Sequence, residues 1–406
     1  MLTFVMGWVA CLSAKVSLQS SSLLMMEQPQ QQEQKRQRRV RYSVSFPKKF
    51  EERHKEHDGD DATIARVLLK GGTPAGSHVP IMPLECLLHL GLLPKTNSMT
   101  LKDDQGDSAV SIDDFDYARD GPLMVVDCTL GYGGHSRLIL DALSEWVDDN
   151  SNVVTSTSMR TKSAILASFD RDGIELVKAE LRLKSRWAQE FDINGNLRLE
   201  CIWSSFANIR DELSHRSLPR IHALLADLGC SSMQVDDPRR GFTWKAEGPL
   251  DMRMDDNAMI TAADLLANST VPTLTSVLRE NSDFDKADAR RLSMAILTNP
   301  RPTTTLELDV RVRGVTPPLL PETDGGKGTK SREVQKDKEQ LNSRVARVMQ
   351  ALRIEVNSEF DQLDKLLKTL PSVLAPGGRA GTFYHEVIYN CSVDDRNTTK
   401  LSFQYS

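Results

Sequence analysis

The sequence lacks several features that would define its class at once. It has no run of about 20 apolar residues, the length needed to cross a membrane, so we expect no transmembrane helix. Its six cysteines form no C-x-x-C pair and no histidine cluster accompanies them, which argues against a structural zinc site and a disulfide framework. Unpaired cysteines favour a reducing compartment such as the cytosol, a mitochondrial matrix or a plastid stroma.

An excess of positive charge is also missing. The chain has 51 Lys+Arg against 56 Asp+Glu, a formal net charge of −5. A surface that binds a nucleic acid must therefore be local, and composition alone gives no support for such binding. With 39% hydrophobic and 26% charged residues, the 406-residue chain has the composition of a globular protein and room for about two structural units.

Residues 1–76 differ from the rest of the chain. Residues 1–12 are apolar, a serine-rich stretch without acids follows, and residues 28–41 hold a glutamine run and a basic run. Such segments bury too little apolar surface to fold. We therefore predict a targeting peptide followed by a disordered tail. The apolar start also fits a secretory-type signal or the first part of a two-part plastid leader. The alternative is a disordered tail, or a wrong start codon, without a targeting role.

Three short apolar runs predict buried parallel strands, at residues 123–127, 164–170 and 221–228. A helical pattern at residues 136–143 follows the first run, and this alternation predicts a parallel α/β sheet with right-handed crossovers. Residues 261–297 and 343–370 show helical spacing of apolar residues, with a flexible loop predicted at 314–340. A turn at residues 375–379 leads to a further strand.

Two features at the predicted strand ends indicate a nucleoside cofactor. The first strand leads into the glycine-rich stretch DCTLGYGGHS at residues 127–136, where glycines allow close backbone approach and a helix N-terminus offers free N–H groups. Asp170 ends the next predicted strand, where an acid can accept both hydroxyls of a ribose. Each feature alone would also fit an ordinary turn or a helix cap.

A long irregular segment identifies the class of enzyme. Residues 226–255, ADLGCSSMQVDDPRRGFTWKAEGPLDMRMD, resemble the bacterial 16S rRNA cytosine-N4-methyltransferase family, which carries D-L-G-V-S-S-P-Q, R-G-F-S-F and G-P-L-D-M-R-M-D in this order. Further resemblances are HVPI at 78–81, TAADLL at 261–266 and RVMQALRIEVN at 347–357. The resemblance spans residues 77 to about 385. It implies a class I Rossmann-like methyltransferase sheet with a helical insertion domain, S-adenosyl-L-methionine as cofactor and no metal.

The resemblance also implies a division of the chain and a partner. After the tail at residues 1–76, residues 77–235 would form the first part of the cofactor-binding α/β domain and residues 236–340 a helical insertion that docks RNA. Residues 341–406 would return to the α/β domain with an atypical C-terminus. The expected partner is small-subunit ribosomal RNA or the ribosomal subunit, with no prediction of oligomeric state. The candidates for phosphate contact are Arg239, Arg240, Arg253, Lys286, Arg290 and Arg291.

The same resemblance assigns site residues by their place in the motifs. Gly133, Gly134 and His135 would bind the methionine end of the cofactor, Asp170 its ribose and Phe206 its adenine, and Asp227 and Gln234 would complete the cofactor site. Methyl transfer to an amine also needs an acceptor for an N–H as the amine attacks. Asp227 is the catalytic candidate, with the neighbouring Ser231/Ser232 turn as a second; Asp227 could equally serve only to hold the cofactor.

Three departures from the family pattern leave alternatives open. His135 and Asp170 stand 35 positions apart (170 − 135), more than the family leads us to expect; Met233 replaces a proline; and no S-L-E-D-R follows residue 385. A catalytically inactive ribosome-assembly factor, or an enzyme of the same core acting on DNA or a metabolite, is therefore kept as an alternative. A nicotinamide dehydrogenase is disfavoured, because the stretch DLGCSS has no role there. We expect an organellar location, chloroplast or mitochondrion, or a cytoplasmic one if the N-terminal segment is no targeting peptide.

Overall fold

The computed structural model describes residues 80, 83–92, 121–148, 162–187, 195–315, 330–384, 387–393 and 399–405. The predicted tail at residues 1–76 lies outside the described residues. Every described residue belongs to one compact unit. The predicted domain boundaries at residues 76/77, 235/236 and 340/341 stay predictions.

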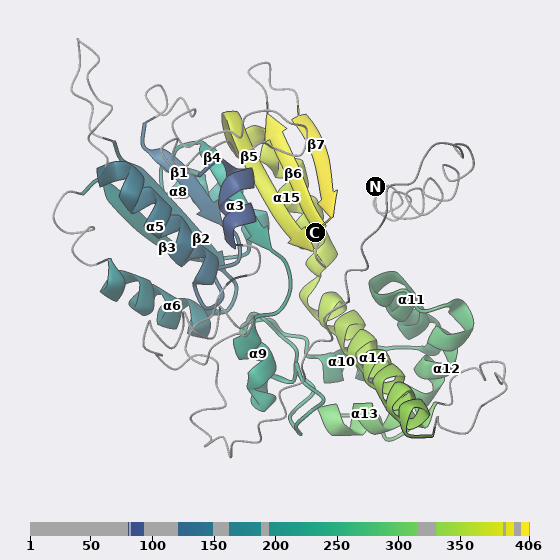
Figure 1. The fold of residues 1–406 in the computed structure, drawn as a ribbon. Helices are drawn as coiled ribbons and strands as arrows, with labels where there is room; N and C mark the ends of the chain where they lie inside the picture. The colour runs from purple at the N-terminus through teal and green to yellow at the C-terminus, as the bar shows by residue number, and fades with distance from the viewer. Residues whose placement is uncertain are drawn as a thin grey trace, which may run out of the picture. The chain divides into compact units, whose positions relative to one another are not determined.

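The α/β part of the fold is built on a seven-stranded sheet with the strand order β3-β2-β1-β4-β5-β6-β7 (Figure 1). The first five strands in this order, β3-β2-β1-β4-β5, are parallel to one another, and β6 and β7 continue the sheet in antiparallel pairing. The order reverses between β1 and β4, and ligands of open α/β sheets bind outside the carboxyl ends of the strands at such a point. The predicted Rossmann-like fold class is confirmed. The strands are β1 (Leu123–Asp127), β2 (Ala164–Asp170), β3 (Leu197–Trp203), β4 (Ile221–Asp227), β5 (Leu374–Tyr384), β6 (Val387–Val393) and β7 (Thr399–Tyr405).

Apolar cores cover both faces of the sheet, because successive residues of a strand point to opposite sides. In β1, Leu123 and Val125 join a core with three helices, whereas Met124 and Val126 join the core on the other face. The helices of the first core are α3 (Pro83–Leu90), α5 (Gly134–Asp148) and α6 (Gly173–Arg186). Those of the second core are α8 (Ile209–His215) and α15 (Glu359–Val373).

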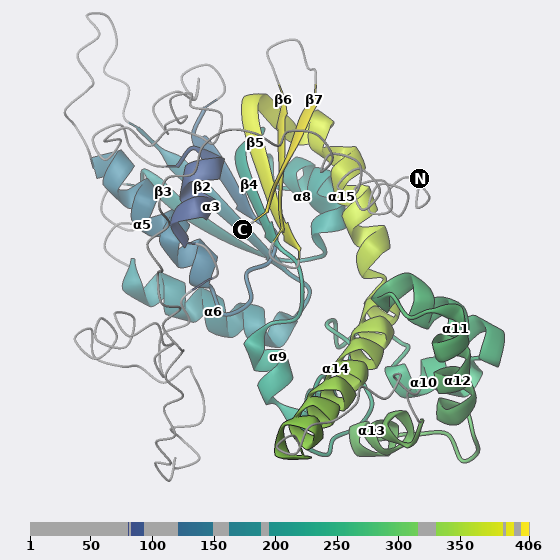
Figure 2. The same cartoon turned by 45° about the vertical axis from the view of Figure 1, so that its right-hand side comes forward.

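A separate helical core lies between β4 and α15 in the sequence (Figure 2). Four helices share this core with the long α14 (Lys330–Asn357). Three of the four lie in the region 261–297 that was predicted to be helical, and α14 overlaps the predicted helix at 343–370. Each of the four begins after a Thr or Asp whose side chain accepts a backbone N–H of the first turn, the usual N-cap arrangement. They are α10 (Ala262–Asn268), α11 (Val271–Ser282), α12 (Lys286–Ile296) and α13 (Thr305–Gly314). None of the helices that the structure describes is long and apolar enough to span a membrane.

Three local predictions were wrong in detail. Residues 330–340, predicted as part of a loop, form the first turns of α14. The single helix predicted at 343–370 is two helices, because Ser358 adopts the left-handed conformation with φ of 48° and ends the regular hydrogen bonding. The turn predicted at 375–379 lies inside β5, where Ile221 pairs with Leu374 but Ala223 pairs with Arg379, so the intervening residues bulge out.

Candidate functional site

A cavity of about 230 Å³ lies at the carboxyl ends of β1, β2 and β4. Its wall brings together six of the seven residues predicted from the sequence, namely Gly134, His135, Asp170, Phe206, Asp227 and Gln234. Gly133 is the exception: it does not line the cavity, whereas its neighbours Gly131 and Tyr132 do. The site therefore lies at the carboxyl ends of the central strands, where ligands of open α/β sheets bind.

Asp127, at the end of β1, holds the glycine-rich loop in place. The buried carboxylate accepts hydrogen bonds from the Ser136 hydroxyl (2.6 Å) and from the Thr129 amide (3.0 Å). The Thr129 hydroxyl in turn accepts a hydrogen bond from the Asp227 amide (2.9 Å). The loop after β1 and the end of β4 are thus fixed to each other, a role for Asp127 that the motif did not predict.

The glycines of this loop are required by its backbone path. Gly133 has a φ of 94°, a conformation that favours glycine, and a side chain there would pack against Leu183 of α6. Gly131, with φ of 48°, donates its amide hydrogen bond to the Asp170 carboxylate at 2.7 Å. Gly133 therefore shapes the loop, while Gly131 and Gly134 form its surface toward the cavity.

Asp170 ends β2 beside this loop. Its second oxygen accepts the amide hydrogen bond of Asp172 at 2.9 Å, so two backbone groups fix the carboxylate. Burial raises the pKa of Asp170 to about 6; the two backbone hydrogen bonds oppose this rise, and the nearby Asp172 and Asp127 carboxylates add to it. Asp170 can accept further hydrogen bonds from hydroxyl groups when it is ionised.

Asp227 and His135 are neighbours in the wall of the cavity. The His135 Nδ1 atom lies 3.7 Å from the Asp227 Oδ2 atom, and the histidine is buried whereas 40% of the Asp227 side chain is exposed. The carboxylate therefore remains accessible to a ligand even though its backbone is fixed through Thr129.

An apolar wall closes the side of the cavity next to β3. Phe206 begins the short 3₁₀ helix η5 (Phe206–Asn208), and Phe360 and Leu363 of α15 line the same cavity. The Ser205 hydroxyl hydrogen-bonds to the Gln362 side chain and so joins η5 to α15. The α15 residues were missed because residues 343–370 were read as one helix; the acids Glu359 and Asp361 after Ser358 signal a new helix start.

Gln234 lies in α9 (Ser232–Asp236), after β4. It forms a capping box with Ser231, whose hydroxyl accepts the Gln234 amide hydrogen bond at 3.3 Å. The Gln234 side chain also donates to the Asp172 carboxylate at 3.2 Å. Gln234 therefore ties α9 to the start of α6 as well as lining the cavity, and its predicted contact with the cofactor stays a prediction.

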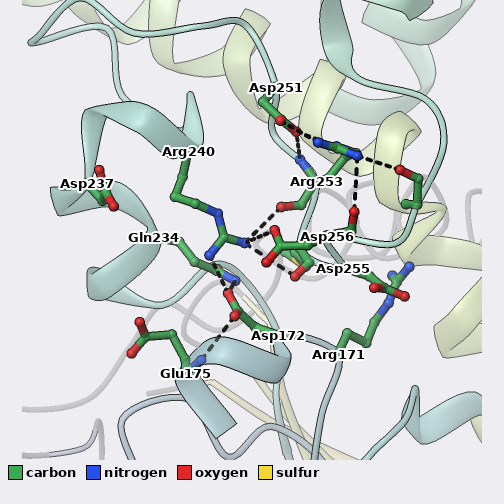
Figure 3. A network of polar contacts seen from close by, with 12 residues as sticks. Arg171, Asp172, Glu175, Gln234, Asp237, Arg240, Asp251, Arg253, Asp255 and Asp256 are labelled. Atoms are coloured by element: carbon green, nitrogen blue, oxygen red, sulfur yellow. Dashed lines mark hydrogen bonds and ion pairs between the residues drawn. The ribbon is translucent and has the colours of Figure 1, made fainter. Parts of the chain in front are cut away.

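Asp172 is the centre of a polar network beside the cavity (Figure 3). It caps α6, is only 1% exposed, and accepts a hydrogen bond from Arg240 Nη1 at 2.7 Å. Arg240 Nη2 donates to the Arg253 carbonyl oxygen at 3.0 Å, and the Arg253 guanidinium binds both oxygens of Asp251. Arg240 and Arg253 are thus both paired with carboxylates and only partly exposed, and their predicted contact with phosphates stays a prediction.

Asn357, the last residue of α14, joins two of the family-like segments. Its buried side chain donates to the Met252 carbonyl oxygen and accepts from the Met254 amide, each at 2.8 Å. Its own carbonyl oxygen accepts from Arg171 Nη1 at 2.8 Å. The RVMQALRIEVN segment thus holds the GPLDMRMD segment against the loop after β2, and Met254 lines the cavity.

Comparison with known proteins agrees with this arrangement. A family model described as the MraW methylase family matches residues 78–406. The chain belongs to the MraW methylase family. A protein of Agathobacter rectalis named ribosomal RNA small subunit methyltransferase H 1 is 33% identical over 348 residues, 84% of this chain and 81% of that protein. A ribosomal RNA small subunit methyltransferase H 2 of Alkaliphilus metalliredigens is 33% identical over 376 residues, 91% of this chain and 86% of that protein.

The cavity of this MraW methylase family member fits the methyl donor that the family implies, S-adenosylmethionine. Gly131 and Gly134 leave room for close approach of a ligand, Asp170 offers acceptors for ribose hydroxyls, and Phe206 offers an apolar face for an adenine. When bound, this donor supplies a methyl group already activated on a sulfonium.

Outside the cavity, four of the predicted phosphate contacts remain at the surface of the methylase: Arg239, Lys286, Arg290 and Arg291. Arg239 pairs with Asp237 (2.8 Å) and Arg291 with Asp288 (3.1 Å). Their predicted contact with phosphates stays a prediction.

Proposed function

We propose that this chain transfers a methyl group from S-adenosylmethionine to the N4 amine of a cytosine in small-subunit ribosomal RNA. One observation supports the proposal most strongly: both ends of the segment with the specific resemblance, residues 226–255, line the cavity. Asp227 near its start and Met254 near its end are lining residues, together with Gly131 and Asp170. The names of the relatives in Agathobacter rectalis and Alkaliphilus metalliredigens support ribosomal RNA as the substrate.

The reaction requires the enzyme to position the cytosine amine, because the methyl group of the donor is already activated. The lone pair of the cytosine N4 atom is delocalised into the ring, so the amine is a weak nucleophile. The enzyme must hold it in line with the methyl group and accept a hydrogen bond from its N–H as positive charge develops. Both tasks need a fixed acceptor beside the donor site.

Asp227 is the residue that we assign to this task. Its carboxylate lines the cavity and is 40% exposed, and its amide is fixed by Thr129. Ser231 is the weaker candidate, because its hydroxyl already accepts the Gln234 amide as the cap of α9. In this mechanism Asp227 accepts the N4 proton as the methyl group is transferred.

The target cytosine must leave its stack to enter a cavity of this size. We propose that RNA docks through the exposed cations Arg239, Lys286, Arg290 and Arg291, beside the GPLDMRMD segment and on α12. The proposed partner is a small ribosomal subunit or its RNA. We also propose an organellar location, chloroplast or mitochondrion; the N-terminal segment on which this depends lies outside the described residues.

An inactive assembly factor is the alternative, since the chain lacks the S-L-E-D-R sequence. The sheet continues through β5, β6 and β7 and the cavity lies beside β4, so the divergent C-terminal sequence leaves both of them formed. The test is to incubate the full chain with labelled S-adenosylmethionine and either small- or large-subunit ribosomal RNA. The proposal expects label in the small-subunit RNA. Binding of that RNA without transfer of label would favour the assembly factor, and label in the large-subunit RNA alone would refute the proposed substrate.

A further inference from the structure

Glu175 has a buried carboxylate oxygen that the methyl-donor site does not yet explain. The residue lies in the first turn of α6, is 7% exposed, and lines the cavity. Its Oε1 atom accepts from Lys178 Nζ at 2.7 Å. Among the residues that the structure describes, its Oε2 atom is the one buried side-chain oxygen that accepts no hydrogen bond.

Such an oxygen requires a donor. A buried carboxylate oxygen loses its hydration, and native proteins seldom leave such an acceptor unused. Two other cavity acids have a donor at each oxygen: Asp170 accepts two backbone amides, and Glu359 is bound at both oxygens by Arg353. Glu175 differs from them because one of its oxygens has no donor, and the residue lines the cavity.

The position of Glu175 indicates which end of the ligand it meets. On the same face of α6, two turns further along, Arg182 stacks on the Tyr132 ring at 3.9 Å and donates to the Tyr132 carbonyl oxygen at 3.1 Å. Leu183 lies against Gly133. Glu175 is thus on the side of the helix that packs against the glycine-rich loop, which the resemblance assigns to the methionine end of the cofactor.

We propose that Glu175 Oε2 binds the ammonium group of the methionine part of S-adenosylmethionine, an inference that rests on the proposed methyl-donor site. The ammonium is the only cationic N–H donor of that molecule, and hydrogen bonds between a cation and a carboxylate are the strongest class available. Its ribose hydroxyls meet Asp170 and its adenine meets Phe206. Lys178 holds the other oxygen and fixes the orientation of the carboxylate.

Two ligands that differ in this group test the proposal by calorimetric titration of the full chain. S-adenosylhomocysteine carries the ammonium and cannot react, and 5′-methylthioadenosine lacks the whole amino-acid part. Glu175→Gln is expected to weaken binding of S-adenosylhomocysteine about tenfold or more and to leave binding of 5′-methylthioadenosine unchanged. Glu175→Ala should do the same, which shows that the effect is not a property of the new amide.

The matched control is Glu180→Gln, the same change on the same helix at a residue paired with Lys184 outside the cavity. It is expected to bind both ligands like the unaltered chain. Unchanged binding of S-adenosylhomocysteine by Glu175→Gln, or equal weakening of both ligands, would overturn the assignment to the ammonium. Failure of the unaltered chain to bind either ligand would refute the methyl-donor site itself, a distinguishable result.

Discussion

Arg240 and Asp172 form an ion pair, with 2.7 Å between Nη1 and Oδ2, in which the carboxylate is 1% exposed and the arginine side chain 16% exposed. The pair joins the segment with the specific resemblance to the loop after β2. Because the Asp172 amide donates to Asp170, the same loop fixes the acid of the methyl-donor site. The surroundings of the cavity thus depend on contacts between distant parts of the chain.

Removal of the Arg240 charge should destabilise the protein. Arg240→Met leaves Asp172 buried without its cation, and breaking one partner of a buried pair costs about 3 kcal/mol in the free energy of unfolding. Urea denaturation measures this value. The control is Arg239→Met at the next residue, whose ion pair with Asp237 is exposed and whose loss should leave the midpoint unchanged. Equal midpoint shifts in the two variants would contradict this account of the pair.

The side chain of Asn357 should stabilise the cavity-lining segment that contains Met254. Asn357→Ala removes a donor and an acceptor from the buried backbone of Met252 and Met254, which should lower the free energy of unfolding by about 2 kcal/mol. Asn268→Ala is the control, because this asparagine is exposed at the end of α10. The midpoint of thermal unfolding should fall for Asn357→Ala and stay unchanged for Asn268→Ala. An unchanged midpoint for Asn357→Ala would show that these hydrogen bonds do not contribute to stability.

Gly248 should not tolerate a side chain. The Cβ of an alanine there would lie 1.8 Å from the Pro238 carbonyl oxygen, so the backbone of the 226–255 segment would have to shift. Gly248→Ala should therefore lower the free energy of unfolding by about 3 kcal/mol. Gly314→Ala is the matched control, since a Cβ at that helix end meets open space. Similar stabilities of the two variants in urea would be evidence against the close packing.

Binding of S-adenosylhomocysteine should depend on pH through Asp170. The pKa of this carboxyl group is about 6, and in the proposed donor site it would accept two ribose hydroxyls only when ionised. Protonation removes an acceptor, so affinity should fall as the pH drops below about 6, by about tenfold at pH 5 relative to pH 8. Calorimetric titration of Asp170→Asn should show weaker binding that lacks this step. The same pH dependence in both proteins would assign the titration to another group.

The central strands could be predicted closely from the sequence. Residues 123–127 and 164–170 were predicted with the observed bounds, because β1 and β2 are covered on both faces and so read as continuous apolar runs. Strand β3 was missed. It is one of the two edge strands, and its buried Leu197 and Leu199 alternate with the exposed Arg198, so only a period of two marks it.

The site could be predicted only where its residues lie in short motifs. The glycine-rich loop and Asp170 were found because local backbone geometry and strand ends determine their roles. The pairing of Asp172 with Arg240 spans 68 residues and that of Met254 with Asn357 spans 103, and no local pattern encodes such contacts. For this reason Arg240 was assigned to the RNA surface, although it neutralises a buried carboxylate.

The most direct test of the proposed function is the identity of the methylated nucleoside. Small-subunit ribosomal RNA would be incubated with the full chain and labelled S-adenosylmethionine, digested to nucleosides and separated by chromatography with mass detection. The account predicts label in N4-methylcytidine, and loss of that label in single-turnover reactions of Asp227→Asn at saturating donor. Label in a different nucleoside, or an undiminished rate for Asp227→Asn, would contradict the reaction or the role of Asp227, respectively.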